Sequence, residues 1–456
     1  MNRRQFLSSL GASALSTAAP GAALAQTRLL SDASLRGTKS AAEYGVLPGL
    51  AGDQSAAFQA MLNTAATAGD AVFLPGGTYV LSGIRLPSGM LLEGVPGRTQ
   101  LAHSGSGPLL QSAGSESITL RGLLIDGLGR PAGEDEGLID LRNVDGLSIE
   151  TCTLRGAGGN AVHMEGCSGA LRGNTISDAG VFAIYSMDGA GLSVSGNTIR
   201  DCRNGGVVIH RSSSGRDGSI VTGNRIENTG AANGGTGEWG NAINFFRTDD
   251  VIAANNIISG SAFTAVRGNS VRRMQVIGNI CRDSGETAIY AEFAFEDAVI
   301  ANNTIDGAAN GISATNLDSG GHGATITGNI IRNLHMTGPY EAEFPGFGTG
   351  IGVEADATVT GNVIADAPLY GINVGWGPYL RDVVISANTI RDARFGIGVS
   401  AAEGAGRALI RDNLISARKS GIQAHEWGKS VASDVLTNPA EAPPNVIVSG
   451  NVASSG

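Results

Sequence analysis

Short runs of alternating apolar and polar residues recur through most of the chain. One kind of run reads apolar-x-Gly-Asn-x-Ile, as in residues 194–199, and a second reads Gly-Ile-x-Val or similar, as in residues 371–374. Alternation with a period of two is typical of β-strands with one buried side. No helical periodicity lies between the two runs, so the pattern predicts two readable strands in each repeat.

A tetrapeptide related to Gly-Asn-x-Ile marks the repeat, and its asparagines lie 23 to 38 residues apart. They are Asn174, Asn197, Asn224, Asn256, Asn279, Asn303, Asn329, Asn362, Asn388, Asn413 and Asn451. A constant minimum period that only insertions lengthen is typical of a stacked solenoid. The Leu-x-x-Leu-x-Leu pattern of leucine-rich repeats is absent. We therefore predict an all-β fold, a single-stranded right-handed parallel β-helix of roughly a dozen coils spaced about 4.8 Å apart.

The recurring asparagines are predicted to be structural. An asparagine at a coil corner can adopt an unusual backbone conformation, and its amide can bond to the equivalent amides above and below. The preceding glycine permits the turn. We therefore expect a buried ladder of asparagines and not a set of ligands.

A short capping helix is predicted before the coils, ended by Gly69 and begun by Asp53 or Ser55. Four apolar residues share one face at helical spacing: Phe58, Met61, Leu62 and Ala65. A strand, a turn and a second strand follow in residues 71–81. Residues 41–117 are accordingly assigned to the N-terminal cap and first coils, and residues 118–456 to the regular repeats.

The N-terminal segment carries a targeting signal. Arg3-Arg4-Gln5-Phe6-Leu7 precedes a small and apolar run that ends in Ala23-Leu24-Ala25. This order predicts a signal peptide over residues 1–25, followed by a polar leader over residues 26–40. The paired arginines resemble a twin-arginine export signal, with a Sec signal as the alternative. We expect a periplasmic protein, exported by the twin-arginine machinery, with no membrane span after signal removal.

The net charge and the cysteine spacing disfavour several classes of partner and cofactor. The net charge is −10, and the signal peptide carries only positive charge, so the mature chain is more acidic still. An acidic chain lacks the basic face that nucleic acid requires. None of the four cysteines forms a Cys-x-x-Cys pair, which disfavours a zinc or redox motif. A Cys167–Cys202 bridge in an oxidising periplasm is left open.

The outward positions of the second strand form two columns of polar and aromatic residues. The first column reads His163, Tyr185, Val208, Asn244, Arg267, Tyr290 and Ser313. The second column reads Glu165, Met187, His210, Phe246, Asn269, Glu292, Thr315 and Glu354. Neighbours in a column should lie about 4.8 Å apart, and the insertions at 230–241 and 334–350 border the same coils. The columns therefore predict one clustered site on an outer face.

We expect this site to suit a carbohydrate, because aromatic rings stack on sugars and arginine pairs with a uronate carboxylate. The candidate catalytic residues are His210, Arg267, Tyr290 and Glu292. The candidate substrate-binding residues are His163, Glu165, Asp188, Arg211, Asn244, Arg247, Asn269 and Trp239. Glu292 with Glu165 or Asp188 could act as paired carboxylates or hold a divalent cation such as calcium. The alternative is a solvated sheet face with ordinary cross-strand pairs, such as Arg267 with Glu292.

Two motifs carry a family resemblance. The segment Phe73-Leu74-Pro75-Gly76-Gly77-Thr78-Tyr79 and the preceding helix resemble the entry module of pectate-lyase-like β-helices. Together with the signal peptide, the Gly-Asn-x-Ile repeats resemble a family of twin-arginine-translocated repeat proteins of unassigned function. The resemblance implies a fold and a bias toward carbohydrate, not a reaction. The Asp-Pro-His-Asp motif of mannuronan epimerases is absent, so that activity is not carried over.

The sequence thus favours an exported β-helix protein that binds or modifies an acidic polysaccharide, as a lyase, glycoside hydrolase or epimerase. The alternative is a non-catalytic periplasmic binding or scaffold protein, with or without a bound cofactor.

Overall fold

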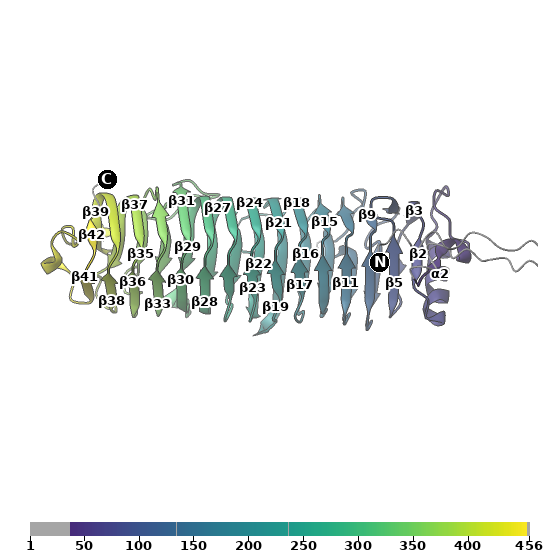
Figure 1. The fold of residues 1–456 in the computed structure, drawn as a ribbon, viewed down its shortest axis with the longest axis horizontal. Helices are drawn as coiled ribbons and strands as arrows, with labels where there is room; N and C mark the ends of the chain where they lie inside the picture. The colour runs from purple at the N-terminus through teal and green to yellow at the C-terminus, as the bar shows by residue number, and fades with distance from the viewer. Residues whose placement is uncertain (1–36, 134, 236, 454–456) are drawn as a thin grey trace, which may run out of the picture. The chain divides into compact units, whose positions relative to one another are not determined.

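The computed structural model describes residues 37–133, 135–235 and 237–453. The expected signal peptide and all of the leader before Gly37 lie outside the described residues. From Thr38 onward the chain winds into a parallel β-solenoid of about 14 turns (Figure 1). The predicted right-handed parallel β-helix with a short N-terminal helix is confirmed.

Each regular coil adds strands to three parallel ladders, here called the first, second and third faces. The first face is a sheet of 16 strands. Its strands are β1 (Lys39–Ser40), β2 (Val72–Leu74), β5 (Met90–Gly94), β8 (Ile118–Arg121), β11 (Leu147–Glu150), β14 (Gly169–Arg172), β17 (Ser193–Ser195), β20 (Ile220–Thr222), β23 (Ile252–Ala254), β26 (Gln275–Ile277), β28 (Glu296–Ala301), β30 (His322–Thr327), β33 (Ala357–Thr360), β36 (Val383–Ser386), β38 (Ala408–Arg411) and β41 (Val446–Ser449).

The second face contains the strands that follow each ladder asparagine and the corresponding strands of the earlier coils. They are β3 (Gly77–Leu81), β6 (Thr99–His103), β9 (Leu124–Asp126), β12 (Thr153–Arg155), β15 (Thr175–Ser177), β18 (Thr198–Cys202), β21 (Arg225–Thr229), β24 (Ile257–Ser261), β31 (Ile330–Leu334), β34 (Val363–Ala365) and β42 (Val452–Ala453), with the first parts of β27 (Ile280–Glu292), β29 (Thr304–Ala314), β37 (Thr389–Ser400) and β39 (Leu414–Glu426).

The third face carries the predicted columns. It consists of β4 (Ile84–Arg85), β7 (Leu110–Ala113), β10 (Gly137–Arg142), β13 (Asn160–Glu165), β16 (Phe182–Met187), β19 (Gly205–Arg216), β22 (Asn241–Asp249), β25 (Val266–Asn269), β32 (Ile351–Val353) and β35 (Tyr370–Val374), with the second parts of β27, β29, β37 and β39. The short β40 (Lys429–Ser430) pairs antiparallel with the end of β39. Long strands that bend from the second face into the third join these two ladders into one sheet.

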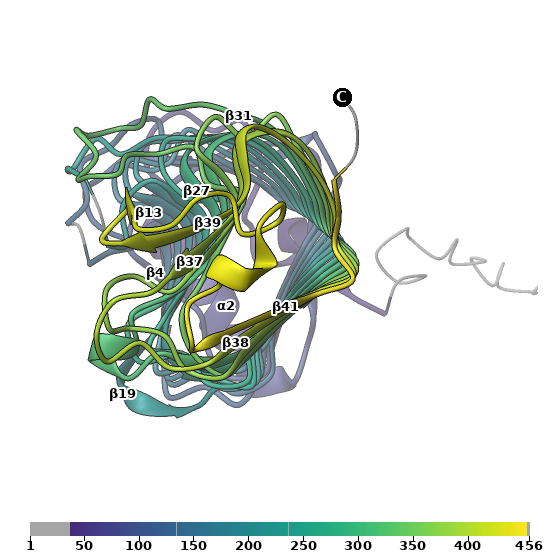
Figure 2. The same ribbon diagram turned by 90° about the vertical axis from the view of Figure 1, so that its left-hand side faces the viewer.

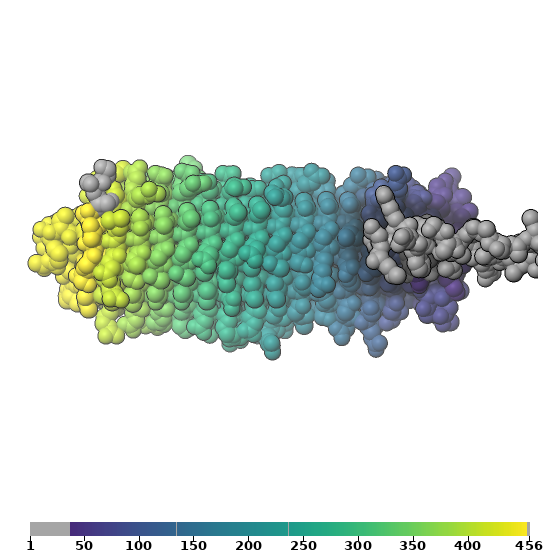
Figure 3. Space-filling view, viewed as in Figure 1, coloured from purple at the N-terminus to yellow at the C-terminus, as the bar shows by residue number. Residues whose placement is uncertain are grey.

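The interior of the solenoid is one continuous apolar core, and successive coils pack closely against one another (Figure 3). Val207 and Ile209 of β19 belong to this core, whereas Val208 between them packs in a separate cluster with Phe182 and Trp239. This alternation confirms which positions of the third-face strands point into the core and which point away from it.

The recurring asparagines form the predicted buried ladder. Asn279 is typical, because its side-chain oxygen accepts bonds from the backbone and side-chain amides of Asn256, both at 3.0 Å. Its own amide donates to the oxygen of Asn303 at 3.0 Å and to the carbonyl of Ala253 at 2.9 Å. The side chain is fully buried. The ladder therefore satisfies polar groups at one corner of every coil from Asn174 to Asn451.

The left-handed conformation falls one residue before each ladder asparagine, not on the asparagine itself as expected. Glycine usually holds this position, as at Gly173 with φ 63° and Gly196 with φ 64°. Where glycine is replaced, the left-handed residue is Asn255, Asn302, Ala387 or Asp412, with φ of 55° to 58°. The turn before the asparagine directs its side chain into the ladder, so the residue that needs freedom is the preceding one.

The capping helix α2 (Ser55–Ala68) lies at the N-terminal end of the solenoid (Figure 1). Its buried residues are the predicted Phe58, Met61, Leu62 and Ala65. Asp53 accepts a bond from the backbone N–H of Ser55 at 2.8 Å, and Gly69 ends the helix at φ 70°. The other helical segments within the described ranges are the 3-10 turns η1 (Ala41–Tyr44), η2 (Leu317–Ser319) and η3 (Pro439–Glu441).

The segment after β39 folds back over the end of the third face. The Asp434 carboxylate accepts bonds from the backbone N–H groups of Gly421 and Ile422 at 2.8 and 2.9 Å, which would otherwise be exposed strand-edge donors. All four cysteines are buried and free, so Cys167 and Cys202 are not bridged. Among the described helices, none has the length and apolar character to span a membrane.

Candidate functional site

The third face places the two predicted columns in the expected order. In the first column Asn244 lies beside Arg267, and Arg267 lies beside Tyr290. In the second column His210, Phe246, Asn269 and Glu292 follow one another on successive coils, and Glu165 and Met187 precede them. The repeat phase therefore places residues from Glu165 to Glu292 in one column, and it brings neighbours on successive coils side by side.

The third face is covered, unlike the solvated face of the alternative prediction, although the cross-strand pair of Arg267 with Glu292 that this alternative named is present. Loops project on both sides of it in the end-on view (Figure 2). His210 and Arg267 are only 7% and 3% exposed. Residues of the 230–241 insertion line a cavity over these strands, and residues of the 334–350 insertion line another. Both insertions thus enclose the predicted site.

Arg267 and Glu292 form a buried ion pair. The guanidinium donates from Nε to Oε2 at 2.8 Å and from Nη2 to Oε1 at 2.7 Å and to Oε2 at 2.6 Å. Asn269 donates to the same carboxylate at 3.2 Å. Burial raises the pKa of Glu292 above its ordinary value, although Arg267 lowers it. The guanidinium carbon also lies 5.5 Å from the centre of the Tyr290 ring. Arg267 is thus already neutralised by a neighbour.

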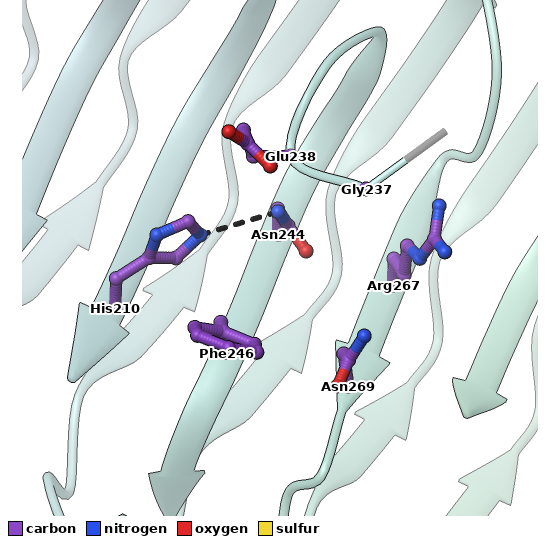
Figure 4. Close-up of a pocket in the computed structure, with 7 residues that line it drawn as sticks. All are labelled: His210, Gly237, Glu238, Asn244, Phe246, Arg267 and Asn269. Atoms are coloured by element: carbon purple, nitrogen blue, oxygen red, sulfur yellow. Dashed lines mark hydrogen bonds between the residues drawn. The ribbon is translucent and has the colours of Figure 1, made fainter. Parts of the chain in front are cut away.

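A cavity of about 200 Å³ lies between the sheet and the 230–241 insertion (Figure 4). We call it the Asn244 cavity. It is lined by His210, Gly237, Glu238, Asn244, Phe246, Arg267 and Asn269. Four of these seven were predicted site residues. The cavity is the place where the predicted catalytic residues His210 and Arg267 meet.

Two buried polar atoms in this cavity have no hydrogen-bond partner among the described residues. They are Oδ1 of Asn244 and Nη1 of Arg267. Nδ2 of Asn244 lies 3.2 Å from Nε2 of His210 (Figure 4). Because the imidazole bonds to only one end of the amide, the other end stays without a partner whichever way the amide is oriented. Unsatisfied buried polar groups destabilise a fold by about 1–3 kcal/mol each, so both atoms are expected to gain a partner from an ordered water or from a ligand.

His210 is a neutral side chain. Burial lowers its pKa to about 4, so the imidazole carries no charge at neutral pH. Its ring contacts Phe246 and Tyr185 edge to face, with centres 5.3 and 5.7 Å apart. At neutral pH the imidazole therefore serves as a hydrogen-bonding group and an aromatic surface.

An aromatic wall continues from this cavity toward the N-terminus. The ring of Tyr185 stacks on Phe182 at 5.8 Å, and Phe182 stacks on Trp239 at 5.3 Å. These rings line an adjoining cavity of about 210 Å³ that shares His210 and Glu238 with the Asn244 cavity. The predicted Trp239 therefore belongs to the site through this wall.

His163 forms a buried pair with Asp140, which the sequence analysis did not single out. Its Nδ1 lies 2.9 Å from Oδ2 of Asp140, and its ring stacks on Tyr185 at 5.4 Å. Burial alone would raise the pKa of Asp140. The bond with His163 and the charge of Arg142 outweigh this effect, so the pKa lies below its ordinary value. Asp140 precedes His163 in the first column, so extending the column by one coil would have identified it.

Besides His163, four predicted binding residues lie outside the cavities. Glu165 is exposed and pairs with Arg142 at 2.6 Å. The other three support the protruding end of β19. Asp188 accepts from the backbone of Ser212 at 2.9 Å, and Arg247 donates to the Ser212 carbonyl at 3.0 Å. Arg211 donates to the Gly189 carbonyl at 3.1 Å. The site prediction is too broad at this edge because it did not foresee the longer β19.

The predicted carboxylate pairs are wrong. Glu292 and Glu165 share a column but are five strands apart, which is about 24 Å at the usual strand spacing. Asp188 is one strand nearer and still beyond reach. No group of three or more His, Cys, Asp or Glu side chains able to hold a metal occurs among the described residues. Neither pair can therefore provide the paired-carboxylate chemistry or the cation site.

Tyr290 lies beyond Arg267 and lines a second cavity, toward the C-terminus. Burial raises the pKa of its phenol, which is therefore neutral at physiological pH. The four predicted catalytic residues thus divide: His210 and Arg267 line the Asn244 cavity, Glu292 pairs with Arg267, and Tyr290 faces the next cavity. Glu238 was missed because it lies in an insertion outside the repeat.

The parallel β-solenoid places the protein among the right-handed β-helix proteins. The family model described as right handed beta helix region matches residues 137–232 and 215–380, more than half of the chain, and the chain belongs to this family. This match supports the resemblance to the pectate-lyase-like β-helix superfamily. A search of the curated proteins finds no match.

Two solved structures illustrate the likeness. The A-module of the Azotobacter vinelandii mannuronan C-5 epimerase AlgE6 matches over 91% of this chain and 99% of its own, with 16% identity and a TM-score of 0.50. The N-terminal fragment of bacteriophage phi29 gene product 12 matches over 84% of this chain and 68% of its own, with 14% identity and a TM-score of 0.51. At these identities the likeness concerns the fold alone.

Proposed function

We propose that the protein is a saccharide-binding β-helix, and that one sugar residue occupies the Asn244 cavity. The observation that carries this proposal is the pair of buried atoms without partners, Oδ1 of Asn244 and Nη1 of Arg267. A sugar hydroxyl both donates and accepts, so one or two adjacent hydroxyls can satisfy both atoms. Phe246 supplies an apolar surface beside them. The mannuronan epimerase module shows that this fold can carry polysaccharide chemistry.

The charges in the cavity favour hydroxyl groups over a carboxylate. Arg267 was expected to pair with a uronate, but its guanidinium already holds Glu292 through three contacts. Glu238 places a further carboxylate in the lining itself. A uronate carboxylate here would face these two acids and only one free guanidinium nitrogen. We therefore propose a neutral sugar residue in this cavity, with the acidic polysaccharide as the competing hypothesis.

Binding is better supported than catalysis. At neutral pH His210 is a weak base with a pKa of about 4, and the phenol of Tyr290 keeps its proton. The Asp140–His163 pair has the geometry of an oriented base, but His163 is buried beneath the stacked Tyr185 ring. Lyase, hydrolase or epimerase activity is accordingly a further question for the assay below.

Calorimetric titration with three hexasaccharides tests the proposal: cellohexaose, a mannuronate hexamer and a galacturonate hexamer. We expect the neutral hexamer to bind, and Asn244→Ala to weaken binding at least tenfold. Asn63→Ala, an exposed change on α2, is the matched control and should bind like the wild type. If no hexamer binds, or if Asn244→Ala binds normally, the proposal is wrong. Selective binding of a uronate hexamer would favour the acidic ligand.

The same samples can be examined for turnover. Ultraviolet absorbance detects the unsaturated products of a lyase, mass spectrometry detects hydrolysis, and proton NMR detects epimerisation. We expect binding without turnover of the neutral hexamer.

The location is also a proposal. The paired Arg3 and Arg4 before the apolar segment support export to the periplasm by the twin-arginine route. Replacing both arginines by lysine should retain the protein in the cytoplasm, as measured by cell fractionation. Continued export of this variant would instead support a Sec signal.

A further inference from the structure

The second cavity on the third face is a separate site. It has a volume of about 370 Å³ and lies between the coils after Arg267 and the 334–350 insertion. We call it the Glu354 cavity. The lining residues used below are Tyr290, Ser313, Gly352, Glu354, Trp376 and Phe344. It shares no lining residue with the Asn244 cavity, so the two can be perturbed independently.

Small residues in the first column open the floor of this cavity. After Arg267 and Tyr290 the column continues with Ser313 and then Gly352 on the next two coils. A Cβ added at Gly352 would meet nothing nearer than a Thr315 methyl group at 3.6 Å. The glycine is therefore not required by crowding, and the small Ser313 and Gly352 leave a hollow in the column after the large side chains of Arg267 and Tyr290.

Aromatic side chains form the walls of the hollow. Trp376 is half-buried and lies 6.2 Å from Phe344 and 5.6 Å from His425, measured between ring centres. Phe344 is 67% exposed, which is unusual for a phenylalanine beside a cavity. Tyr290 closes the side toward Arg267. Flat aromatic walls around a polar floor suit the alternating apolar and hydroxyl-bearing faces of a sugar ring.

Glu354 is the buried acidic group of the cavity, and Glu343 is a second acid in its lining. It is 8% exposed, and its Oε2 accepts a bond from the backbone N–H of Leu317 at 2.7 Å. No arginine, lysine or histidine forms an ion pair with it within the described ranges. It thus differs from Glu292, whose carboxylate is held by Arg267.

We propose that the Glu354 cavity is a second saccharide site, in which a sugar ring stacks on Trp376 and hydrogen-bonds to the Glu354 carboxyl group. The inference rests on the proposed function, since it assumes a saccharide ligand. It adds a second position on the same face, with its own aromatic platform and its own acid.

The proposal implies that binding here depends on pH. Burial raises the pKa of Glu354 to about 7, against the lowering effect of its backbone bonds, and Asp318 on η2 adds to the increase. A bound sugar excludes water from the carboxyl group, which disfavours the charged form and raises the pKa further. Affinity should therefore be highest below pH 7 and should fall as the pH rises through 7. If the sugar raises the pKa by one unit, the affinity falls about fivefold between pH 6 and 8.

Other groups around the carboxyl do not reverse this sign. The phenol of Tyr290 on β27 is neutral, because burial raises its pKa. Burial lowers the pKa of His425 on β39 to about 4, so this ring is neutral too. Glu343 of the 334–350 insertion lines the same cavity and can only disfavour a second negative charge.

The guanidinium of Arg381 is a cation in the neighbourhood of Glu354. The backbone of Arg381 bonds to the Glu354 carbonyl, but its guanidinium pairs with Asp356, from Nε to Oδ1 at 3.0 Å. It is thus committed to another carboxylate.

The positions of the three tryptophans of the chain allow binding at the two cavities to be measured separately by fluorescence. Trp239 lies on the wall beside the Asn244 cavity, Trp376 lines the Glu354 cavity, and Trp427 contacts Trp376. We would titrate Trp239→Phe and Trp376→Phe with cellohexaose and the two uronate hexamers at pH 6 and pH 8, following tryptophan fluorescence. Asn63→Ala on the capping helix is the control, because this exposed residue lines neither cavity.

We expect Trp239→Phe to retain a saturable signal, with an affinity about fivefold lower at pH 8 than at pH 6. Glu354→Gln in that background should bind equally at both pH values, because its amide cannot ionise. Trp376→Ala lacks the reporter, so its binding is measured by calorimetry and should be at least tenfold weaker. Binding that responds to Asn244→Ala but to none of the Glu354 or Trp376 variants overturns this inference alone. Equal affinity of Trp239→Phe at both pH values also overturns it. Absence of binding by every hexamer overturns both proposals.

Discussion

The buried pair of Arg267 and Glu292 offers a quantitative test of the site. Its two side chains are 4% and 8% exposed and share three contacts of 2.6 to 2.8 Å. Replacing Arg267 by methionine leaves a buried carboxylate without its cation, and replacing Glu292 by methionine leaves the reverse. Removing one partner of such a pair typically costs about 3–5 kcal/mol. We expect each single variant to lose about 3 kcal/mol of unfolding free energy at pH 7.5.

The double variant distinguishes a buried pair from a surface pair. With both charges replaced by methionine, no uncompensated charge remains, and the loss should be about 1 kcal/mol or less. The measurement is urea unfolding followed by circular dichroism, with slopes that agree among the four proteins. A double variant that loses the sum of the two single losses would refute the reasoning, because the charges would then act independently.

The pH dependence of Arg267→Met provides a second readout. Burial already raises the pKa of Glu292, and loss of the guanidinium removes the main opposing effect. The folded variant then retains a proton that the unfolded chain releases above its ordinary carboxyl pKa. Its stability relative to the wild type should accordingly improve as the pH is lowered from 8 to 5. An unchanged difference across this range would indicate that Glu292 is not the group left uncompensated.

Three further predictions concern the repeat and the thiols. Asn279→Ala removes four buried ladder bonds and should lower the free energy of unfolding in urea by about 3 kcal/mol or more. Asn451→Ala, at the half-exposed end of the ladder, should lower it by less than about 1 kcal/mol. Equal losses would contradict a buried ladder. Ala387→Gly should raise the unfolding free energy by about 1 kcal/mol, because alanine is strained at φ 55°; a loss of stability would contradict this. Burial raises the pKa of all four thiols. A thiol reagent should therefore label no cysteine of the folded protein within minutes, and all four after unfolding. Rapid labelling of any cysteine in the folded protein would contradict its burial.

The fold could be predicted because the repeat determines the position of the strands in every coil. The position of each ladder asparagine sets the phase of the following strands, and that phase determined the order of side chains from Glu165 to Glu292. Helix α2 was predictable for a related reason, since its four buried residues obey a helical period. These features depend on local spacing, which a single sequence contains.

The covering of the site could not be predicted in this way. The 230–241 and 334–350 insertions follow no repeat, so nothing in their spacing indicates that they close over the third face. The burial of His210 and Arg267, and the cavity beside Asn244, depend on those insertions. The expected pairing of Glu292 with Glu165 failed for the opposite reason, because the regular strand spacing holds them too far apart.

The central claim is that the Asn244 cavity holds a sugar residue, and a crystal structure of the protein soaked with cellohexaose tests it most directly. We predict density for a sugar ring in this cavity, with hydroxyl oxygens within about 3.2 Å of the Asn244 amide and of Nη1 of Arg267. An empty cavity at saturating ligand, or a sugar bound only elsewhere on the solenoid, would contradict the account.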